Sequence, residues 1–250
     1  MSRRSPARNG AMFALAMLSA TAAIGSLASA QGPPGDGGSA TRGRALFADG
    51  CSSCHGLDAR GEPGRGPSLV GAGAAAADFY LSTGRMPLDD PGEEPLRSEP
   101  AYSHTEIDDL VAYVGSLGGP PIPAVDPDAG DLNAGFRAFR NNCAGCHQTV
   151  ARGWIVPGGV APPLQGDVTP TQVAEAVRIG PYVMPRFSER QIDQPTLDSI
   201  ARWVRETRHP DDRGGWGIGH IGPIPEGMVA WLLAGVALLL IARLIGERTT

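Results

Sequence analysis

The chain has 250 residues, with 26 acidic against 21 basic side chains and a formal net charge of −5. This acidic balance, without any stripe of basic residues, argues against a protein that binds nucleic acid. The 4 cysteines all lie in two short motifs, which leaves none for disulfide bonds or for a thiol nucleophile.

The first segment, residues 1–30, is predicted to be a secretory signal peptide or an N-terminal membrane anchor. Arg3, Arg4 and Arg8 precede an Ala-rich apolar stretch that ends in Ala28-Ser29-Ala30, a small-residue pattern typical of signal cleavage. Polar and small residues dilute the second half of the stretch, which favours a signal peptide. Either interpretation places the rest of the chain outside the cytoplasm.

Two C-x-x-C-H motifs follow, as Cys51-Ser52-Ser53-Cys54-His55 and as Cys143-Ala144-Gly145-Cys146-His147. This spacing is the attachment signal of c-type haem, in which both thiols add to vinyl groups and the histidine ligates the iron. The pairs are too far apart for a zinc ribbon, whose pairs sit about 15–20 residues apart. A thioredoxin-like redox pair or a structural disulfide leaves both histidines unexplained. The sequence therefore predicts two covalently bound haem c groups, attached at Cys51, Cys54, Cys143 and Cys146, with His55 and His147 as iron ligands.

The two motifs belong to two copies of one unit. Gly43 and Phe47 before the first motif return as Gly135 and Phe139 before the second, at the same offset of 92 residues as the cysteines. Two further segments repeat in the same order: Pro67–Gly71 returns as Pro162–Gly166, and Met86-Pro87 returns as Met184-Pro185.

Each unit ends in a run with helical periodicity. In the first unit this helix is predicted to begin at Thr105, with Asp108 completing a capping box. The apolar positions that define the two helical faces are Ile107, Leu110, Val111, Val114 and Leu117 in the first unit, and Leu197, Ile200, Trp203 and Val204 in the second. Helices at the start and end of each unit that cross over a haem are the architecture of class I cytochromes c.

Methionine usage predicts the remaining iron ligands. Of 6 methionines, only Met86 and Met184 lie between the leader and the C-terminal apolar run, and each is followed by proline. A lone methionine is usually a packing residue, but matching positions in a repeat favour ligation. A thioether ligand favours Fe(II) and raises the reduction potential. Met86 and Met184 are therefore predicted sixth ligands, which leaves no open iron position and favours electron transfer over peroxidase or O₂ chemistry.

Several other residues carry weaker signals. The histidines His104, His209 and His220 are expected to be solvated or capping residues. An acidic loop either steers a basic partner or is a solvated insertion; its residues are Asp89, Asp90, Glu93, Glu94 and Glu99. Arg85 and Trp154 are candidates for contacts with haem propionates.

The predicted domains are residues 40–118 and 132–208, joined by a Pro/Gly-rich linker at 119–131 that favours extended backbone. Each domain has about 75–80 residues, a size at which an apolar core alone gives marginal stability. A covalently bound haem is therefore expected to complete each core.

The chain closes with a Gly-rich juxtamembrane segment, 209–226, and a predicted transmembrane helix, 227–246. A helix of about 20 apolar residues crosses a bilayer, and Arg243 near its end can extend to the interface. A buried core helix is the alternative, but the run has no polar face. Glu226 precedes the run and Arg248 follows it, so the positive-inside rule puts the C-terminus in the cytoplasm and the haem domains on the extracytoplasmic side of the cell membrane.

The expected fold is mostly α, with two tandem class I cytochrome c domains and a C-terminal transmembrane helix. This assembly resembles the dihaem cytochrome c subunit (cytochrome cc, cytochrome c1-type) of the actinobacterial menaquinol–cytochrome c reductase, a bc1-type complex. The segment from Gly66-Pro67-Ser68-Leu69 to Thr83-Gly84-Arg85-Met86-Pro87 is similar to that family's first haem domain. Gly222-Pro223-Ile224-Pro225-Glu226-Gly227 is similar to its approach to the membrane. The loop Leu88–Tyr102 is longer than the family pattern.

The resemblance implies an electron-carrying subunit of quinol–cytochrome c reductase, a respiratory translocase. It implies that the first iron accepts electrons from the Rieske iron–sulfur subunit, which oxidises menaquinol at the cytochrome b subunit, and that the second domain passes them to an aa3-type oxidase. The expected partners are these proteins and membrane lipid. The nearest alternative is a membrane-anchored dihaem cytochrome c acceptor subunit of a periplasmic dehydrogenase. A dihaem peroxidase or thiosulfate-oxidising cytochrome requires an open iron position or a different sixth ligand.

Overall fold

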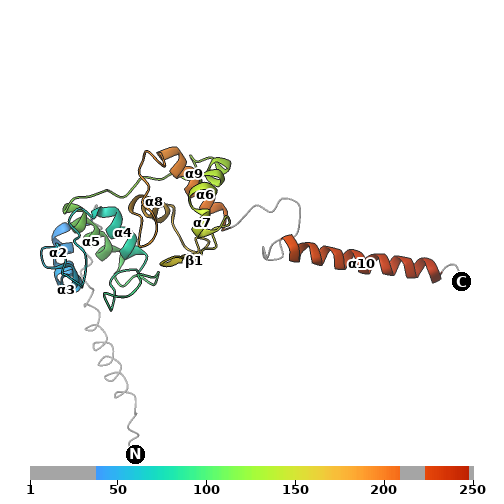
Figure 1. The fold of residues 1–250 in the computed structure, drawn as a ribbon, viewed down its shortest axis with the longest axis horizontal. Helices are drawn as coiled ribbons and strands as arrows, with labels where there is room; N and C mark the ends of the chain where they lie inside the picture. The colour runs from blue at the N-terminus through green and yellow to red at the C-terminus, as the bar shows by residue number, and fades with distance from the viewer. Residues whose placement is uncertain (1–37, 209–222, 248–250) are drawn as a thin grey trace, which may run out of the picture. The chain divides into compact units, whose positions relative to one another are not determined.

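The computed structural model describes residues 38–208 and 223–247. The predicted leader, the segment 209–222 with His209 and His220, and Arg248 lie outside the described residues. The described chain divides into two compact units, one formed by residues up to 123 with residues 178–182, the other by residues 124–177 and those from 183 onward. In chain order (Figure 1) the elements are α2 (Ala40–Gly50), α3 (Ser52–His55), α4 (Gly73–Ser82), α5 (His104–Ser116), α6 (Leu132–Asn142), α7 (Ala144–His147), β1 (Trp154–Val156), β2 (Gly159–Ala161), α8 (Pro170–Ile179), α9 (Gln194–Glu206) and α10 (Pro223–Glu247).

In the first unit, α2 and α5 cross at a glycine. A Cβ atom on Gly43 would lie 1.9 Å from the carbonyl oxygen of Asp109, so only glycine allows this approach. One turn later Phe47 is 1 % exposed, and its ring centroid lies 5.1 Å from that of Tyr113 on α5. Helix α4 packs against the same α5. The repeated glycine and phenylalanine are therefore the residues through which the first and last helices of the unit meet.

The second unit repeats this crossing with α6 and α9. A Cβ atom on Gly135 would lie 2.0 Å from the carbonyl oxygen of Ser199. Phe139 is buried in the core of this unit, and the rings of Phe136 and Trp203 meet with centroids 4.9 Å apart. The same residue types thus position the same helix pair in both units.

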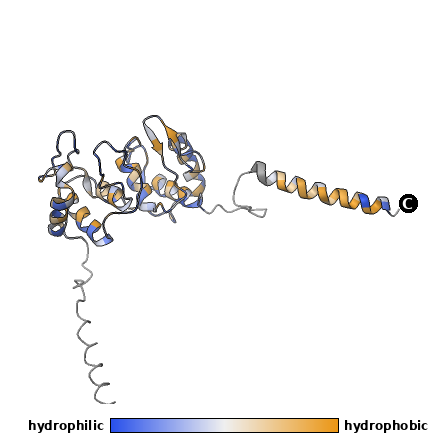
Figure 2. Ribbon diagram, turned by 90° about the horizontal axis from the view of Figure 1, so that it is seen from below, coloured by the Kyte–Doolittle hydropathy of each residue, from blue (hydrophilic) through white to orange (hydrophobic). Residues whose placement is uncertain are grey.

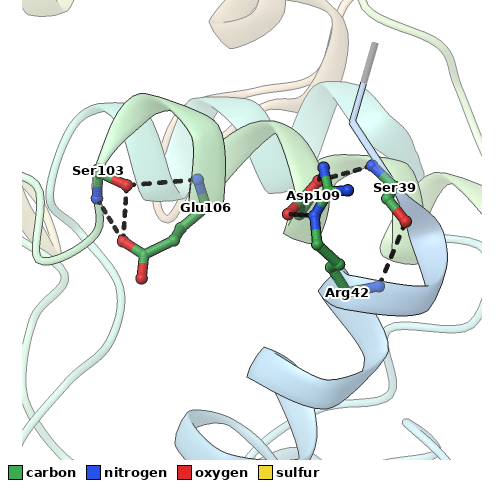
Figure 3. Close-up of polar contacts among 5 residues, drawn as sticks. All are labelled: Ser39, Arg42, Ser103, Glu106 and Asp109. Carbon is green, nitrogen blue, oxygen red and sulfur yellow. Dashed lines mark hydrogen bonds and ion pairs between the residues drawn. The ribbon is translucent and has the colours of Figure 1, made fainter. Parts of the chain in front are cut away.

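An ion pair between the exposed side chain of Arg42 and the buried side chain of Asp109 also joins α2 to α5 (Figure 3). The side chain of Asp109 is buried, and its Oδ2 accepts a hydrogen bond of 2.7 Å from Nε of Arg42. Its Oδ1 accepts from Nη2 of Arg42 at 2.8 Å and from the N–H of Ser39 at 2.6 Å. The hydrogen bonds from Arg42 are the main cause that lowers the pKa of Asp109. Asp109 therefore fixes the start of α2 against the middle of α5.

The predicted cap of α5 is wrong. The helix begins at His104, with Ser103 as its N-cap, whereas Thr105 and Asp108 were expected to form the capping box. Glu106 Oε2 accepts from the N–H of Ser103 at 2.9 Å, and Ser103 Oγ accepts from the N–H of Glu106 at 3.5 Å (Figure 3). The longer glutamate side chain reaches back to the N-cap, so the Ser-x-x-Glu sequence two residues upstream sets the start of the helix.

The segment between the two units is hydrogen-bonded at both ends. At its start, the carbonyl oxygen of Pro120 accepts from the N–H of Ala75 at 3.3 Å. At its end, the N–H of Asp126 donates to Oδ1 of Asp198 on α9 at 2.9 Å. The segment is thus hydrogen-bonded to α4 of the first unit and to α9 of the second.

Helix α10 is mostly hydrophobic along its length, with hydrophilic residues near its C-terminal end, as the colouring in Figure 2 shows. Residues Gly227–Glu247 are long and apolar enough to cross a membrane, and none of this span is buried against other described parts of the chain. Near its end, Arg243 Nε lies 3.0 Å from Oε1 of Glu247, one turn later.

Candidate haem c sites

Each C-x-x-C-H motif forms one tight turn directly after the first helix of its unit. The N–H of Cys51 donates to the carbonyl oxygen of Phe47 at 2.9 Å, and the N–H of His55 donates to that of Cys51 at 3.0 Å. The corresponding bonds in the second unit are 2.7 and 2.9 Å long. The predicted attachment residues Cys54 and Cys146 lie within these turns, on α3 and α7. Each turn therefore presents two sulfur atoms and one imidazole from five consecutive residues.

No disulfide joins the four cysteines, all of which lie in the described part of the chain. Burial raises the pKa of Cys143 to about 12, and burial is also the main cause that raises the pKa of Cys51. Thiols that stay protonated at neutral pH are poor nucleophiles. Cys51 and Cys143 are therefore not activated as thiolate nucleophiles.

Both histidines are oriented by a backbone carbonyl. The Nδ1 atom of His55 lies 2.8 Å from the carbonyl oxygen of Pro67, and Nδ1 of His147 lies 3.1 Å from that of Pro162. Because a carbonyl oxygen only accepts, Nδ1 carries the hydrogen, and Nε2 keeps its lone pair for a metal. Burial lowers the pKa of His147, with the Pro162 bond acting in the opposite direction, so this imidazole is neutral at pH 7. The repeated proline segments thus supply the carbonyls that orient the two imidazoles.

The two predicted methionine ligands pack against the apolar cores. Met86 lies against the cluster of the first unit that also holds Phe47 and Cys51. Its N–H donates to the carbonyl oxygen of Tyr80, near the end of α4, at 3.1 Å. Met184 lies against the corresponding cluster of the second unit. Each unit therefore brings its methionine and its motif to one apolar cluster.

These donors suit a haem better than a directly coordinated metal ion. Across the described ranges, no three His, Cys, Asp or Glu side chains come together as a metal site. The arrangement of these side chains does not support a four-cysteine zinc site. A porphyrin supplies its own nitrogen ligands and requires from the protein thioether links and axial donors. The paired thiols, the free Nε2 of each histidine and the partly buried thioether of each methionine meet that requirement.

The remaining candidates are not part of these clusters. His104 is an exposed residue at the start of α5, and Trp154 on β1 is 64 % exposed. The acidic loop 88–102 is largely exposed, but it is attached to the first unit because the N–H of Ser98 donates to the carbonyl oxygen of Thr83 at 3.1 Å. The setting of Arg85 is considered below.

The sequence analysis missed two features near the sites. The side chain of Tyr102 interacts with the thiol of Cys51, a contact that no local pattern indicates. The β1–β2 hairpin follows the second motif, and the N–H of Gly153 before it donates to the carbonyl oxygen of His147 at 3.0 Å. Its two-residue connection, Pro157-Gly158, lies between short apolar runs, and that pattern does predict a turn.

Comparison with known families supports a cytochrome c domain in each half of the chain. Residues 40–118 match the family described as cytochrome c, and residues 130–204 match the family described as cytochrome c oxidase, cbb3-type, subunit III. The predicted fold class, mostly α with two cytochrome c domains and one C-terminal apolar helix, is confirmed. Cytochrome c domains carry covalently bound haem c, so the predicted cofactor is confirmed as well.

Several curated proteins are similar along most of the chain. The cytochrome bc1 complex cytochrome c subunit of Mycobacterium leprae is 36 % identical over 215 residues, which cover 82 % of this chain and 74 % of that protein. The subunit of the same name from Corynebacterium diphtheriae is 32 % identical over 83 % of this chain and 80 % of its own length. A cbb3-type cytochrome c oxidase subunit CcoP from Azospirillum is 31 % identical over 65 % of this chain and 60 % of that protein. Among solved structures, reduced recombinant cytochrome c4 from Pseudomonas stutzeri matches with a TM-score of 0.25 at 19 % identity, over 67 % of this chain and 98 % of that one.

Proposed function

The chain belongs to the family of actinobacterial cytochrome bc1 complex cytochrome c subunits, and from this premise we propose that it is the dihaem electron-transfer subunit of a quinol–cytochrome c reductase. Electron transfer in the respiratory chain is the function of this family. The observation that carries the proposal is the repeat, because each unit holds its own C-x-x-C-H turn, carbonyl-oriented histidine and partly buried methionine. The alternative of a dehydrogenase acceptor subunit is not favoured by these relatives.

We propose the following roles for the site residues. Cys51 and Cys54 attach the first haem, and Cys143 and Cys146 attach the second. His55 with Met86 would hold the first iron, and His147 with Met184 would hold the second. The hydrogen bonds from each Nδ1 to a proline carbonyl and the packing of each methionine in an apolar cluster support this assignment.

When bound, each haem supplies an iron centre that takes up and releases one electron. The residues around it determine how readily that happens. The carbonyl oxygens of Pro67 and Pro162 hold each imidazole in the tautomer that binds metal. The apolar clusters around Phe47 and Phe139 exclude water, and a dry environment with a thioether ligand favours the reduced iron.

The proposed electron path runs from the Rieske iron–sulfur subunit, which receives electrons from quinol at the cytochrome b subunit, through the two domains of this chain to an aa3-type oxidase. Helix α10 is proposed to anchor the chain in the membrane, with Arg243 on the cytoplasmic side. Residues 40–118 and 132–208 are the proposed domains, linked by residues 119–131. Residues 1–30 are the proposed leader.

Affinity purification of the tagged chain from its native membranes in mild detergent tests this function. The proposal predicts that cytochrome b and a Rieske protein co-purify with it, and that the dithionite-reduced spectrum shows haem b beside haem c. Added haem a would identify the oxidase as a bound partner. Co-purification with a quinoprotein or flavoprotein dehydrogenase instead would support the acceptor-subunit alternative.

A further inference from the structure

Arg85, the residue before Met86, has an unusual environment for an arginine. Its guanidinium is half-buried, and Nη1 donates to the carbonyl oxygen of Pro95 at 2.6 Å. Its Cζ atom lies 5.4 Å from the ring centroid of Phe79, a buried residue of α4. The Nε atom is buried and has no hydrogen-bond partner among the described residues. The guanidinium is therefore held firmly while one of its donors is left unused.

The cation of Arg85 also forms no direct ion pair, and Glu94 acts on it only through electrostatic attraction. None of the ion pairs in the described part of the chain involves it, although five carboxylates follow in the adjacent loop. Partly buried cations are normally paired, because desolvation without a counter-charge costs free energy. The cation–π contact with Phe79 and the hydrogen bond to one neutral carbonyl compensate for this desolvation cost only in part. The guanidinium therefore lacks a directly bonded anion.

The nature of that anion follows from the neighbouring residue. Met86 packs into the apolar cluster that also contains Cys51, where the proposed function requires a haem. Haem c carries two carboxylates on its rim, and a guanidinium binds a carboxylate with a planar fork of N–H donors. We propose that Arg85 binds a propionate carboxylate of the first haem through its unpaired Nε–H, an inference that rests on the proposed function.

The acidic loop holds Arg85 in this position. Besides the bond that Pro95 accepts from Arg85, Ser98 Oγ donates to the carbonyl oxygen of Gly84, and the N–H of Ser98 donates to that of Thr83. A Cβ atom on Gly84 would lie 2.3 Å from the carbonyl oxygen of Ser98, so the loop packs directly on the residue before Arg85. The loop 88–102 thus holds the guanidinium of Arg85 in position.

The second unit provides an internal control. The residue before Met184 is Val183, which is partly exposed and carries no charge. Loss of Arg85 should therefore alter the first haem and leave the second unchanged.

The test is a potentiometric titration of the full-length purified chain with Arg85→Gln, Arg85→Lys and Arg97→Gln. Arg97 is an exposed cation of the same loop, so its removal controls for a change of charge alone. Haem content per chain is measured first. A wild-type chain without two haems would refute the proposed function, whereas two haems in the wild type leave only the role of Arg85 in question.

For Arg85→Gln we expect two haems, with one couple shifted to lower potential by about 59 mV, a tenfold change in the one-electron equilibrium constant. The potential should fall less in Arg85→Lys, and the reduction potentials of both haems should be unchanged in Arg97→Gln. The carboxylate bands of isotope-labelled propionate in the redox-difference infrared spectrum should move in both Arg85 variants only. If Arg85→Gln loses a haem, the test rests on Arg85→Lys, whose propionate carboxylate bands should move if Arg85 binds the propionate. Unchanged potentials and carboxylate bands in an Arg85 variant with two haems would overturn the proposal.

Discussion

The imidazole Nδ1 of His55 lies 2.8 Å from the carbonyl oxygen of Pro67, twelve residues further along the chain. The same contact recurs between His147 and Pro162. These bonds explain why the proline segment is repeated in both units. Each proline segment fixes the tautomer of the histidine that precedes it in the chain. In each unit a backbone carbonyl thus orients the histidine, whereas apolar packing positions the methionine.

Replacement of Met86 by alanine should leave the first haem attached, because the thioether bonds to cysteine are unaffected. The potential of that haem should fall by more than about 59 mV, since the ligand that favours reduced iron is lost. Quinol oxidation should slow. Potentiometry and the methionine–iron(III) charge-transfer band measure the change, with Met228→Ala in α10 as the matched control. An unchanged potential would remove Met86 from the set of ligands.

Replacement of both Cys51 and Cys54 by alanine should abolish one haem and destabilise the first unit. The apolar cluster around Phe47 is small, and the haem is expected to complete it. Haem staining and hydrogen exchange of peptides from α2 and α5 measure both effects. The corresponding double replacement of Cys143 and Cys146 should affect peptides of α6 and α9 instead. A folded product with two haems would contradict the attachment sites.

Gly43→Ala should destabilise the first unit by about 3 kcal/mol, the range of severe overpacking. The added Cβ would lie 1.9 Å from the carbonyl oxygen of Asp109, so α2 would have to move away from α5. Gly166→Ala, where nothing lies within 4 Å of the added Cβ, is the control. Hydrogen exchange of α5 peptides should increase only for Gly43→Ala. Equal protection in both variants would show that the two helices do not cross at Gly43.

The ion pair between Asp109 and Arg42 should make the stability of the first unit depend on pH. The hydrogen bonds from Arg42 lower the pKa of Asp109 in the folded state below the unfolded value of about 3.9. The stabilisation is therefore present at neutral pH and is lost as the pH falls below about 3.9, through the lowered folded pKa. Asp109→Asn should cost about 1–3 kcal/mol at pH 7 and reduce this acid sensitivity.

Hydrogen exchange of α2 peptides at pH 7, and thermal unfolding from pH 7 to pH 3, measure this effect. Asp108→Asn, at the exposed neighbouring position on the same helix, should keep the acid sensitivity of the wild type. If Asp109→Asn and the wild type lose stability in parallel, Asp109 is not the titrating group.

Local patterns predicted the features whose causes are local. The helix periodicity, the C-x-x-C-H turns and the order of the repeat could all be predicted, and the fold class followed from them. The cap of α5 was placed at Thr105 instead of Ser103, although the Ser103-x-x-Glu106 signal was present in the sequence. The Pro157-Gly158 hairpin was likewise visible in the sequence but was missed.

Features that depend on distant segments could not be predicted. Gly43 was identified as a repeated residue, but its role depends on the carbonyl of Asp109, which is 66 residues away in the chain. Asp109 itself is a charged residue among the apolar positions of α5, and only its partner Arg42 explains why it is 3 % exposed. The unpaired Nε of Arg85 is also a property of tertiary packing, because Pro95 and Phe79 create its surroundings.

The most direct test of the account is to determine the haem content and axial ligation of the purified full-length chain. We predict two haem c groups per chain by pyridine haemochrome, two low-spin iron centres, and a methionine–iron(III) charge-transfer band that is partly lost in Met86→Ala and in Met184→Ala and wholly lost in the double variant. One haem per chain, or a band that survives the double variant, would contradict the claim that each unit binds one haem between its histidine and its methionine.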